Sequence, residues 1–121
     1  MPKKILLVDD DPKILTIEKT ILTQGGYTVE TALDGVSALE KLKASQFDGI
    51  ILDILMPYMD GYQVAKEVKK LESYKDTPII MVTAAQERDA LERGFESGAV
   101  MFMSKPFTAA RLLGVLSTVV R

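Results

Sequence analysis

Short apolar runs that alternate with longer segments of helical periodicity constrain the fold of this chain more than any other feature. Most of these runs carry no polar residue, which is typical of strands buried on both faces. They span residues 5–8, 27–32, 49–52, 78–82 and 100–103. Five strands, each followed by a helix, predict an α/β fold: a doubly wound sandwich in which helices cover both faces of a five-stranded parallel sheet.

Capping residues mark where the helices begin and end. Asp11 precedes Pro12, which suits the first helical position, and Gly25 and Gly26 end the same segment. Asp34 begins a second helix. Residues 61–71 and 86–96 form the third and fourth helices, and Thr108 begins a last helix that runs to the C-terminus.

The composition excludes several classes of chemistry. The chain has no cysteine and no histidine, so disulfides, thiolate catalysis and histidine-bound zinc are excluded. Its net charge of −2 gives no reason to expect direct binding of nucleic acid or of an anionic membrane. The apolar run 5–8 is too short for a signal peptide or a membrane span. We therefore expect a single cytoplasmic domain over residues 1–121.

Polar residues stand where the predicted strands end. They are Asp9, Asp10 and Asp11 after the first strand, Asp53 at the end of the third, Thr83 at the end of the fourth and Lys105 after the fifth. Because ligands of doubly wound sheets bind beyond the carboxyl ends of the strands, we expect these side chains to form one site.

The donor set of this edge favours magnesium and phosphate chemistry. Clustered carboxylates repel one another, and a hard divalent cation, Mg²⁺ or Mn²⁺, removes the conflict. A carboxylate can itself be the nucleophile that forms an aspartyl phosphate. Lys105 and Thr83 would then hold phosphoryl oxygens by charge and by hydrogen bonding. By contrast, Asp11, Asp34 and Asp60 are most simply explained as helix caps.

Several motifs of this edge occur together. They are Val8-Asp9-Asp10, Leu52-Asp53, Met56-Pro57, Met59-Asp60-Gly61, Val82-Thr83-Ala84, Gly98-Ala99 and Lys105-Pro106-Phe107. With this combination, the whole chain resembles the receiver domains of bacterial two-component response regulators, including the chemotaxis receivers. The resemblance implies a flavodoxin-like sheet in strand order 2-1-3-4-5.

The resemblance also implies a role for each residue of the acidic edge. Asp53 corresponds to the phosphoryl acceptor, Asp10 to a direct magnesium ligand and Asp9 to a ligand that acts through water. Asp53 itself and the backbone carbonyl of Leu55 would complete the metal site.

Three further residues correspond to the switch of this family. Thr83 and Lys105 match the pair that holds the phosphoryl group and relays its arrival. Phe102 matches the aromatic residue that turns inward when the threonine moves. The Lys105–Pro106 peptide bond matches one that is cis in the family.

The function implied is a phosphorylation-activated signalling switch of a phosphorelay, which modifies itself and is not an enzyme acting on an external substrate. Its donor would be the phosphohistidine of a sensor histidine kinase or of a histidine phosphotransfer protein. Its output would pass to a downstream protein effector through residues 86–96, residues 100–103 and the last helix, without binding nucleic acid or membrane itself. Both a stand-alone regulator and a receiver cut from a longer protein agree with the sequence.

The chain departs from the family pattern at that output surface. Val100 and Met101 stand where members often carry acidic residues, and the last helix is mostly apolar between Leu112 and Val120. Two interpretations follow, in which these residues either bind a partner through apolar contact or simply pack on the core.

A second departure concerns the lifetime of the phosphorylated state. Leu55 stands two residues after Asp53, and Ala85 stands two residues after Thr83. Neither side chain is able to orient an attacking water, so we predict that self-dephosphorylation is slow and the aspartyl phosphate long-lived.

The sequence agrees less well with three other functions. A haloacid-dehalogenase-type phosphatase would use Asp9 and Asp11 as its nucleophile motif, but Pro12 and Lys13 replace the expected continuation. A flavin carrier would need a glycine- or hydroxyl-rich phosphate loop where three aspartates stand. A degenerate receiver would lack some of the key residues, all of which are present here.

Overall fold

The computed structural model describes residues 2–83, 96, 98–105 and 107–120. Its centre is a sheet of five parallel strands in the order β2-β1-β3-β4-β5. The strands are β1 (Lys4–Val8), β2 (Thr28–Ala32), β3 (Gly49–Asp53), β4 (Ile79–Thr83) and β5 (Met101–Ser104). The predicted doubly wound fold and its strand order are therefore confirmed.

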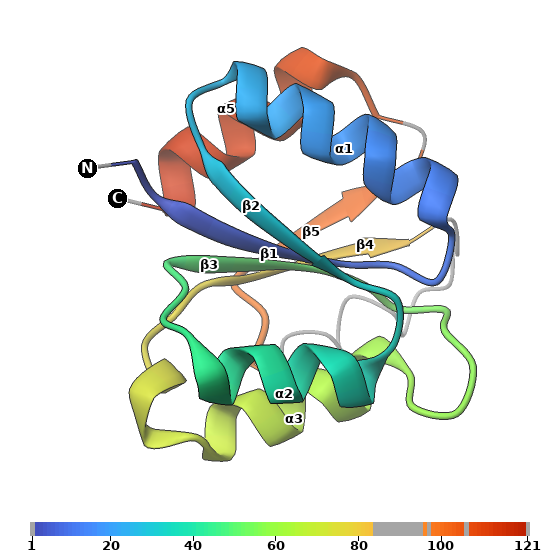
Figure 1. The fold of residues 1–121 in the computed structure, drawn as a ribbon, viewed down its shortest axis with the longest axis vertical. Coiled ribbons are helices and arrows are strands. Elements are labelled where there is room, and N and C mark those ends of the chain that lie inside the picture. The colour runs from blue at the N-terminus through green and yellow to red at the C-terminus, as the bar shows by residue number, and fades with distance from the viewer. Residues whose placement is uncertain (1, 84–95, 97, 106, 121) are drawn as a thin grey trace.

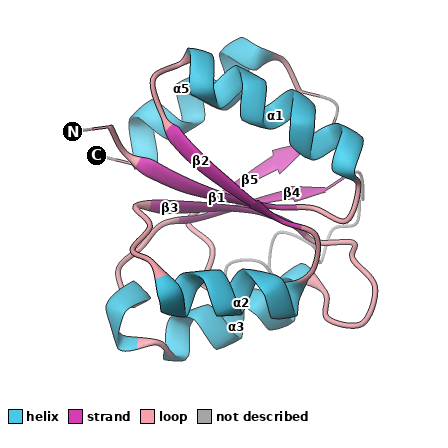
Figure 2. Cartoon of the chain, viewed as in Figure 1, coloured by secondary structure: helices cyan, strands magenta, loops and turns pink. Residues whose placement is uncertain are grey.

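Helices cover both faces of the sheet (Figure 1). Those assigned in the described part of the chain are α1 (Pro12–Gln24), α2 (Gly35–Ala44), α3 (Gly61–Lys70), the short 3₁₀ helix η1 (Glu72–Tyr74) and α5 (Ala109–Val119). Helices α1 and α5 lie on one face, and α2 and α3 lie on the other, so the molecule has three layers (Figure 2).

The two faces of the sheet make two separate cores because successive side chains of a strand point to opposite sides. In β1, Leu6 and Val8 join the core under α2 and α3, whereas Ile5 and Leu7 join the core under α1 and α5. Both faces are thus apolar, which is why the strands are continuous hydrophobic runs rather than alternating ones.

The helices begin at the predicted caps. The side chains of Asp11, Asp34 and Thr108 accept hydrogen bonds from backbone N–H groups in the first turns of α1, α2 and α5. Asp60 and Gln63 form a reciprocal capping box at the start of α3. The carboxylates of Asp11, Asp34 and Asp60 are therefore engaged in starting helices.

The apolar residues of the last helix are explained mostly by packing. Leu112, Val115, Leu116 and Val120 are buried in the core under α1 and α5, so they are not part of a partner surface. Of the apolar residues singled out near that surface, Val100 is half exposed and remains available for contact. The predicted helix 86–96 lies outside the described residues except for its last position.

Element boundaries differ from the sequence predictions by one or two residues, as for β2, which begins at Thr28 rather than Tyr27. None of the helices in the described ranges is both long and apolar enough to cross a membrane.

Candidate functional site

Strand register brings the predicted site residues to one edge of the sheet. Val8 pairs with Leu52 across β1 and β3, so Asp9 and Asp53 follow on adjacent strands. Thr83 pairs with Ser104 across β4 and β5. The N–H group of Lys105 then donates to the Thr83 carbonyl at 2.9 Å, which extends this ladder and fixes the lysine at the same edge.

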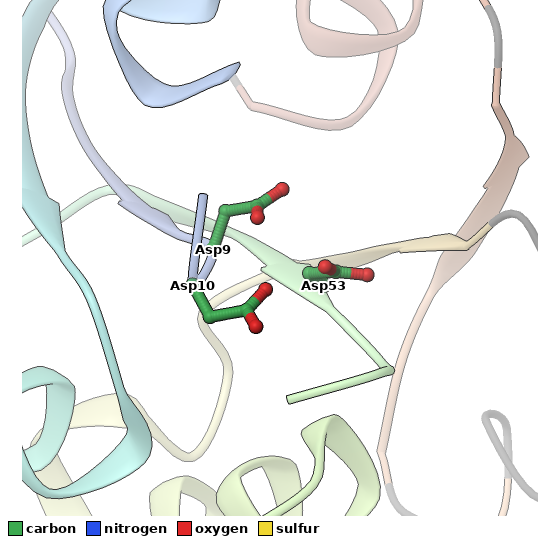
Figure 3. Close-up of side chains that lie close together, drawn as sticks. All are labelled: Asp9, Asp10 and Asp53. Atoms are coloured by element: carbon green, nitrogen blue, oxygen red, sulfur yellow. The ribbon is translucent and has the colours of Figure 1, made fainter. Parts of the chain in front are cut away.

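Three aspartates form a carboxylate cluster at this edge (Figure 3). Asp9, Asp10 and Asp53 each offer a carboxylate oxygen, and these oxygens lie within 4.8 Å of one another. Asp9 and Asp53 are buried, whereas Asp10 is exposed to solvent. The cluster is thus reachable from outside although two of its three carboxylates are removed from water.

Lys105 supplies the positive charge that faces the cluster. Its ammonium lies 3.0 Å from Asp9 Oδ2 and 3.5 Å from Asp53 Oδ2. The other oxygen of Asp9 accepts a hydrogen bond from the backbone N–H of Asp11 at 2.9 Å. Asp9 is therefore held between a backbone donor and the lysine, with little rotational freedom.

Burial and a neighbouring negative charge both disfavour the ionised form of Asp53. Burial and the neighbouring Asp9 raise the pKa of the Asp53 carboxyl to about 6, although Lys105 and the Leu55 N–H oppose the rise. The Leu55 N–H lies 3.4 Å from Asp53 Oδ1. A divalent cation would relieve this repulsion, and an all-oxygen donor set suits Mg²⁺.

The backbone approaches closely behind the cluster at Gly61. A Cβ atom at this position would lie 2.6 Å from the Asp53 carbonyl oxygen and 2.8 Å from the Ile54 Cα, closer than real Cβ atoms pack. The Gly61 N–H donates to the Ile54 carbonyl at 2.9 Å. The glycine therefore lets the start of α3 rest directly on the end of β3, the strand that carries Asp53.

The remaining predicted residues are placed as follows. Thr83 is fully buried at the end of β4. Phe102 on β5 is partly buried and packs against the core under α2 and α3. Leu55 is exposed on the loop after β3. Ala85 and Pro106 lie outside the described residues.

Asp11 does not belong to the cluster. Its Oδ1 accepts from the Lys13 N–H at 2.9 Å, which caps α1. The paired use of Asp9 and Asp11 that a haloacid-dehalogenase-type phosphatase requires is therefore not supported.

The sequence prediction missed one residue near the site. Glu18 on α1 is buried with 4% of its surface exposed, and its pKa is raised to about 7 by burial and by the charge of Asp9. A signal was present in the sequence, since Glu18 is spaced three residues after Leu15 and four before Leu22. Both leucines lie on the buried stripe of the helix.

The fold and the acidic cluster together define a flavodoxin-like α/β protein that carries a metal-binding type of site at the switch point of its sheet. The sequence model of the protein family described as the response regulator receiver domain matches residues 5–117 of this chain. The chain therefore belongs to the response regulator receiver domain family.

Relatives and solved structures agree with this assignment. The chain is 37% identical over 121 residues to the alkaline phosphatase synthesis transcriptional regulatory protein PhoP of Bacillus subtilis, matching all of this chain and 50% of PhoP. It resembles the structure of the chemotaxis protein CheY4 of Vibrio cholerae with a TM-score of 0.95 and 39% identity, covering 98% of this chain and 99% of CheY4.

A third similar structure contains a metal ion. The receiver domain of the sensor histidine kinase PA1611 of Pseudomonas aeruginosa matches with a TM-score of 0.91 and 30% identity, covering 99% of this chain and 98% of that one. That structure holds a magnesium ion coordinated in its active site cleft.

The chain spans about half the length of the curated relatives it matches, 50% of PhoP and 52% of the response regulator MprA of a Mycobacterium species.

Proposed function

We propose that residues 1–121 form a single phosphoacceptor domain in which Asp53 accepts a phosphoryl group. The observation that carries this proposal is the carboxylate cluster of Asp9, Asp10 and Asp53 with Lys105 ion-paired across it. A carboxylate beside a lysine and a hard-cation site has the parts that phosphoryl transfer needs.

The transfer step follows from the position of Asp53. An oxygen of its ionised carboxylate attacks phosphorus, the phosphorus–nitrogen bond of a phosphohistidine breaks, and the imidazole leaves with the electron pair. The product is an aspartyl phosphate. Because the pKa of Asp53 is about 6, the nucleophilic form predominates at neutral pH.

The residues around Asp53 would hold the metal and the phosphoryl group. Asp10, Asp53 and the Leu55 carbonyl would bind Mg²⁺ directly, and Asp9 through water. The ion would neutralise charge between carboxylate and phosphoryl oxygens. The ammonium of Lys105, already within 3.5 Å of Asp53, would contact the transferred group.

Thr83 and Phe102 would transmit the modification. Thr83 is fully buried at the end of β4, and Phe102 stands on the neighbouring strand β5. A movement of the threonine toward the phosphoryl group would leave room for the aromatic ring, and the surface at β5 and α5 would change with it.

Membership of the receiver family supports a phosphohistidine donor, on a sensor histidine kinase or on a histidine phosphotransfer protein. This chain has no histidine and cannot itself be that donor. The output would go to a protein effector rather than to nucleic acid bound by this domain. The name of PhoP describes a transcriptional regulator, and an effector domain beyond the length matched here would make a comparable output.

The test is incorporation of a phosphoryl group from acetyl phosphate. It is measured as the mass of the intact protein, in the presence and in the absence of Mg²⁺. The wild-type chain should gain one phosphoryl group only with Mg²⁺, and Asp53→Asn should gain none. Asp60→Asn is the matched control because asparagine preserves the helix cap on the same loop. Equal incorporation into Asp53→Asn, or none into the wild type, would overturn the assignment.

The same assay tests the predicted lifetime. With the side chain of Leu55 exposed on the loop and unable to position water, the aspartyl phosphate should persist for minutes or longer after the donor is removed. Decay within seconds contradicts the prediction of slow self-dephosphorylation.

A further inference from the structure

Glu18 is the residue of the described structure whose burial the proposed function leaves unexplained. It stands on the inward stripe of α1, and its Oε2 is the buried side-chain atom found without a hydrogen-bond partner among the described residues. A buried carboxylate oxygen without a donor lowers the stability of the fold, so we expect a donor for Glu18 near this otherwise apolar stripe.

The pocket that Glu18 helps to line identifies that donor. A largely apolar cavity of about 360 Å³ lies between α1 and the loop that follows β5. It is lined by Ile14, Ile17, Glu18, Ile21, Lys105 and Phe107. Among the described residues of this lining, Lys105 is the cation, so Glu18 and Lys105 border the same largely apolar pocket.

The charges that face Glu18 come from three elements. Asp9 after β1 and Asp53 on β3 disfavour its ionised form, whereas Lys105 after β5 favours it. The interaction is mutual, because the Glu18 charge in turn helps to raise the pKa of the Lys105 ammonium. Phe107, on the loop that leads into α5, is uncharged.

The Lys105 ammonium has three donors for these surroundings. One reaches Asp9 at 3.0 Å, and the longer approach to Asp53 is 3.5 Å. A rotation of its flexible four-carbon chain toward α1 would give Glu18 the donor that it lacks.

We propose that Glu18 is a positioning residue that offers the Lys105 ammonium a second carboxylate partner, in competition with Asp9 and Asp53. This inference rests on the proposed function of Asp53. While Lys105 contacts Asp9 and Asp53, it is placed for the phosphoryl group. While it contacts Glu18, the acidic cluster lacks its cation. Glu18 therefore weakens the hold of the lysine on a phosphoryl group at Asp53.

The first experiment measures the affinity for beryllofluoride, a phosphoryl mimic, in the presence of Mg²⁺. The full chain is compared with Glu18→Gln and with Glu18→Leu. Both variants should bind about fivefold more tightly, because each removes a charge that competes for Lys105. Glu40→Gln, the same change at an exposed position of α2 on the opposite face, should bind like the wild type. Unchanged or weaker binding by both Glu18 variants overturns the proposal.

The second experiment does not depend on phosphorylation. The lysine side-chain ¹³Cε and ¹⁵Nζ resonances are recorded for the wild type, Glu18→Gln and Glu40→Gln, with Lys105→Arg to assign the Lys105 signal. Glu18→Gln should shift the Lys105 signal, and Glu40→Gln should not. A purely structural role for Glu18 predicts no selective shift. If no protein binds beryllofluoride but this shift is seen, the function proposed for Asp53 fails while the link between Glu18 and Lys105 stands.

Discussion

Replacing Glu18 by leucine should stabilise the fold, and the gain should grow as the pH rises. The side chain is buried on α1 beside an apolar cavity, and its pKa lies at about 7 rather than at the ordinary value of 4.5. Each pKa unit corresponds to about 1.36 kcal/mol. Ionising Glu18 therefore costs on the order of 3 kcal/mol more in the folded protein than in the unfolded chain.

The direction of the pH dependence follows from the raised pKa of Glu18. Well below pH 4.5 the carboxyl is protonated in both states, so its ionisation does not affect stability. Between 4.5 and about 7 the unfolded chain releases the proton while the folded protein keeps it, so the wild type loses stability as the pH rises. Above about 7 the penalty is fully present. Leucine has no proton to lose and escapes it.

Urea unfolding of the two proteins measures this difference. The stability advantage of Glu18→Leu should increase by about 2–3 kcal/mol from about pH 5 to about pH 8. Glu40→Leu, the same substitution at an exposed position of α2, should show no such increase. An advantage of Glu18→Leu that stays constant with pH would show that the gain comes from packing alone and not from the ionisation of Glu18.

Two backbone positions give further predictions. Tyr58 has a positive φ of 70° and a fully exposed side chain. Tyr58→Gly should therefore raise the free energy of unfolding by about 1 kcal/mol. A midpoint of urea unfolding equal to that of the wild type would contradict this prediction. Gly61→Ala should lower the free energy of unfolding by about 2 kcal/mol because the new Cβ meets the backbone of Asp53. Gly114→Ala on α5 is the control for Gly61, since nothing lies within 4 Å of its Cβ position and the helix should gain about 0.5–1 kcal/mol.

Much of the fold was predictable because its signals are local. Uninterrupted apolar runs such as residues 49–52 predict buried parallel strands, and the caps Asp11 and Asp34 predict where helices begin. The strand order is different in kind. It depends on which strands pair across the sheet, and no local pattern in the chain encodes that pairing, so the order is implied only by the resemblance to receivers.

The site was predictable for a related reason. Asp53 and Thr83 end strands, and parallel strands bring their carboxyl ends to one edge whatever the details of packing. The sequence does not reveal which ionisable side chains lie close enough to change one another's pKa. Helical periodicity places Glu18 on the buried stripe of α1. It does not show that Asp9, Asp53 and Lys105 lie close enough to affect the Glu18 carboxyl, because these residues come from other elements of the fold.

The raised pKa values of Asp53 and Glu18 have related causes, because both carboxyl groups are buried and both are close to Asp9 and Lys105. Asp9, Asp53 and Glu18 are buried carboxyl groups, and Lys105 is the cation that the described structure places among them. Ionising all three carboxyls therefore leaves excess negative charge in a medium of low dielectric, which the fold tolerates at a cost in stability. A ligand that brings positive charge only to the folded state offsets that cost, so binding of a divalent cation and stability are linked. The same excess charge that would weaken the fold at neutral pH would therefore favour binding of a cation at this edge of the sheet.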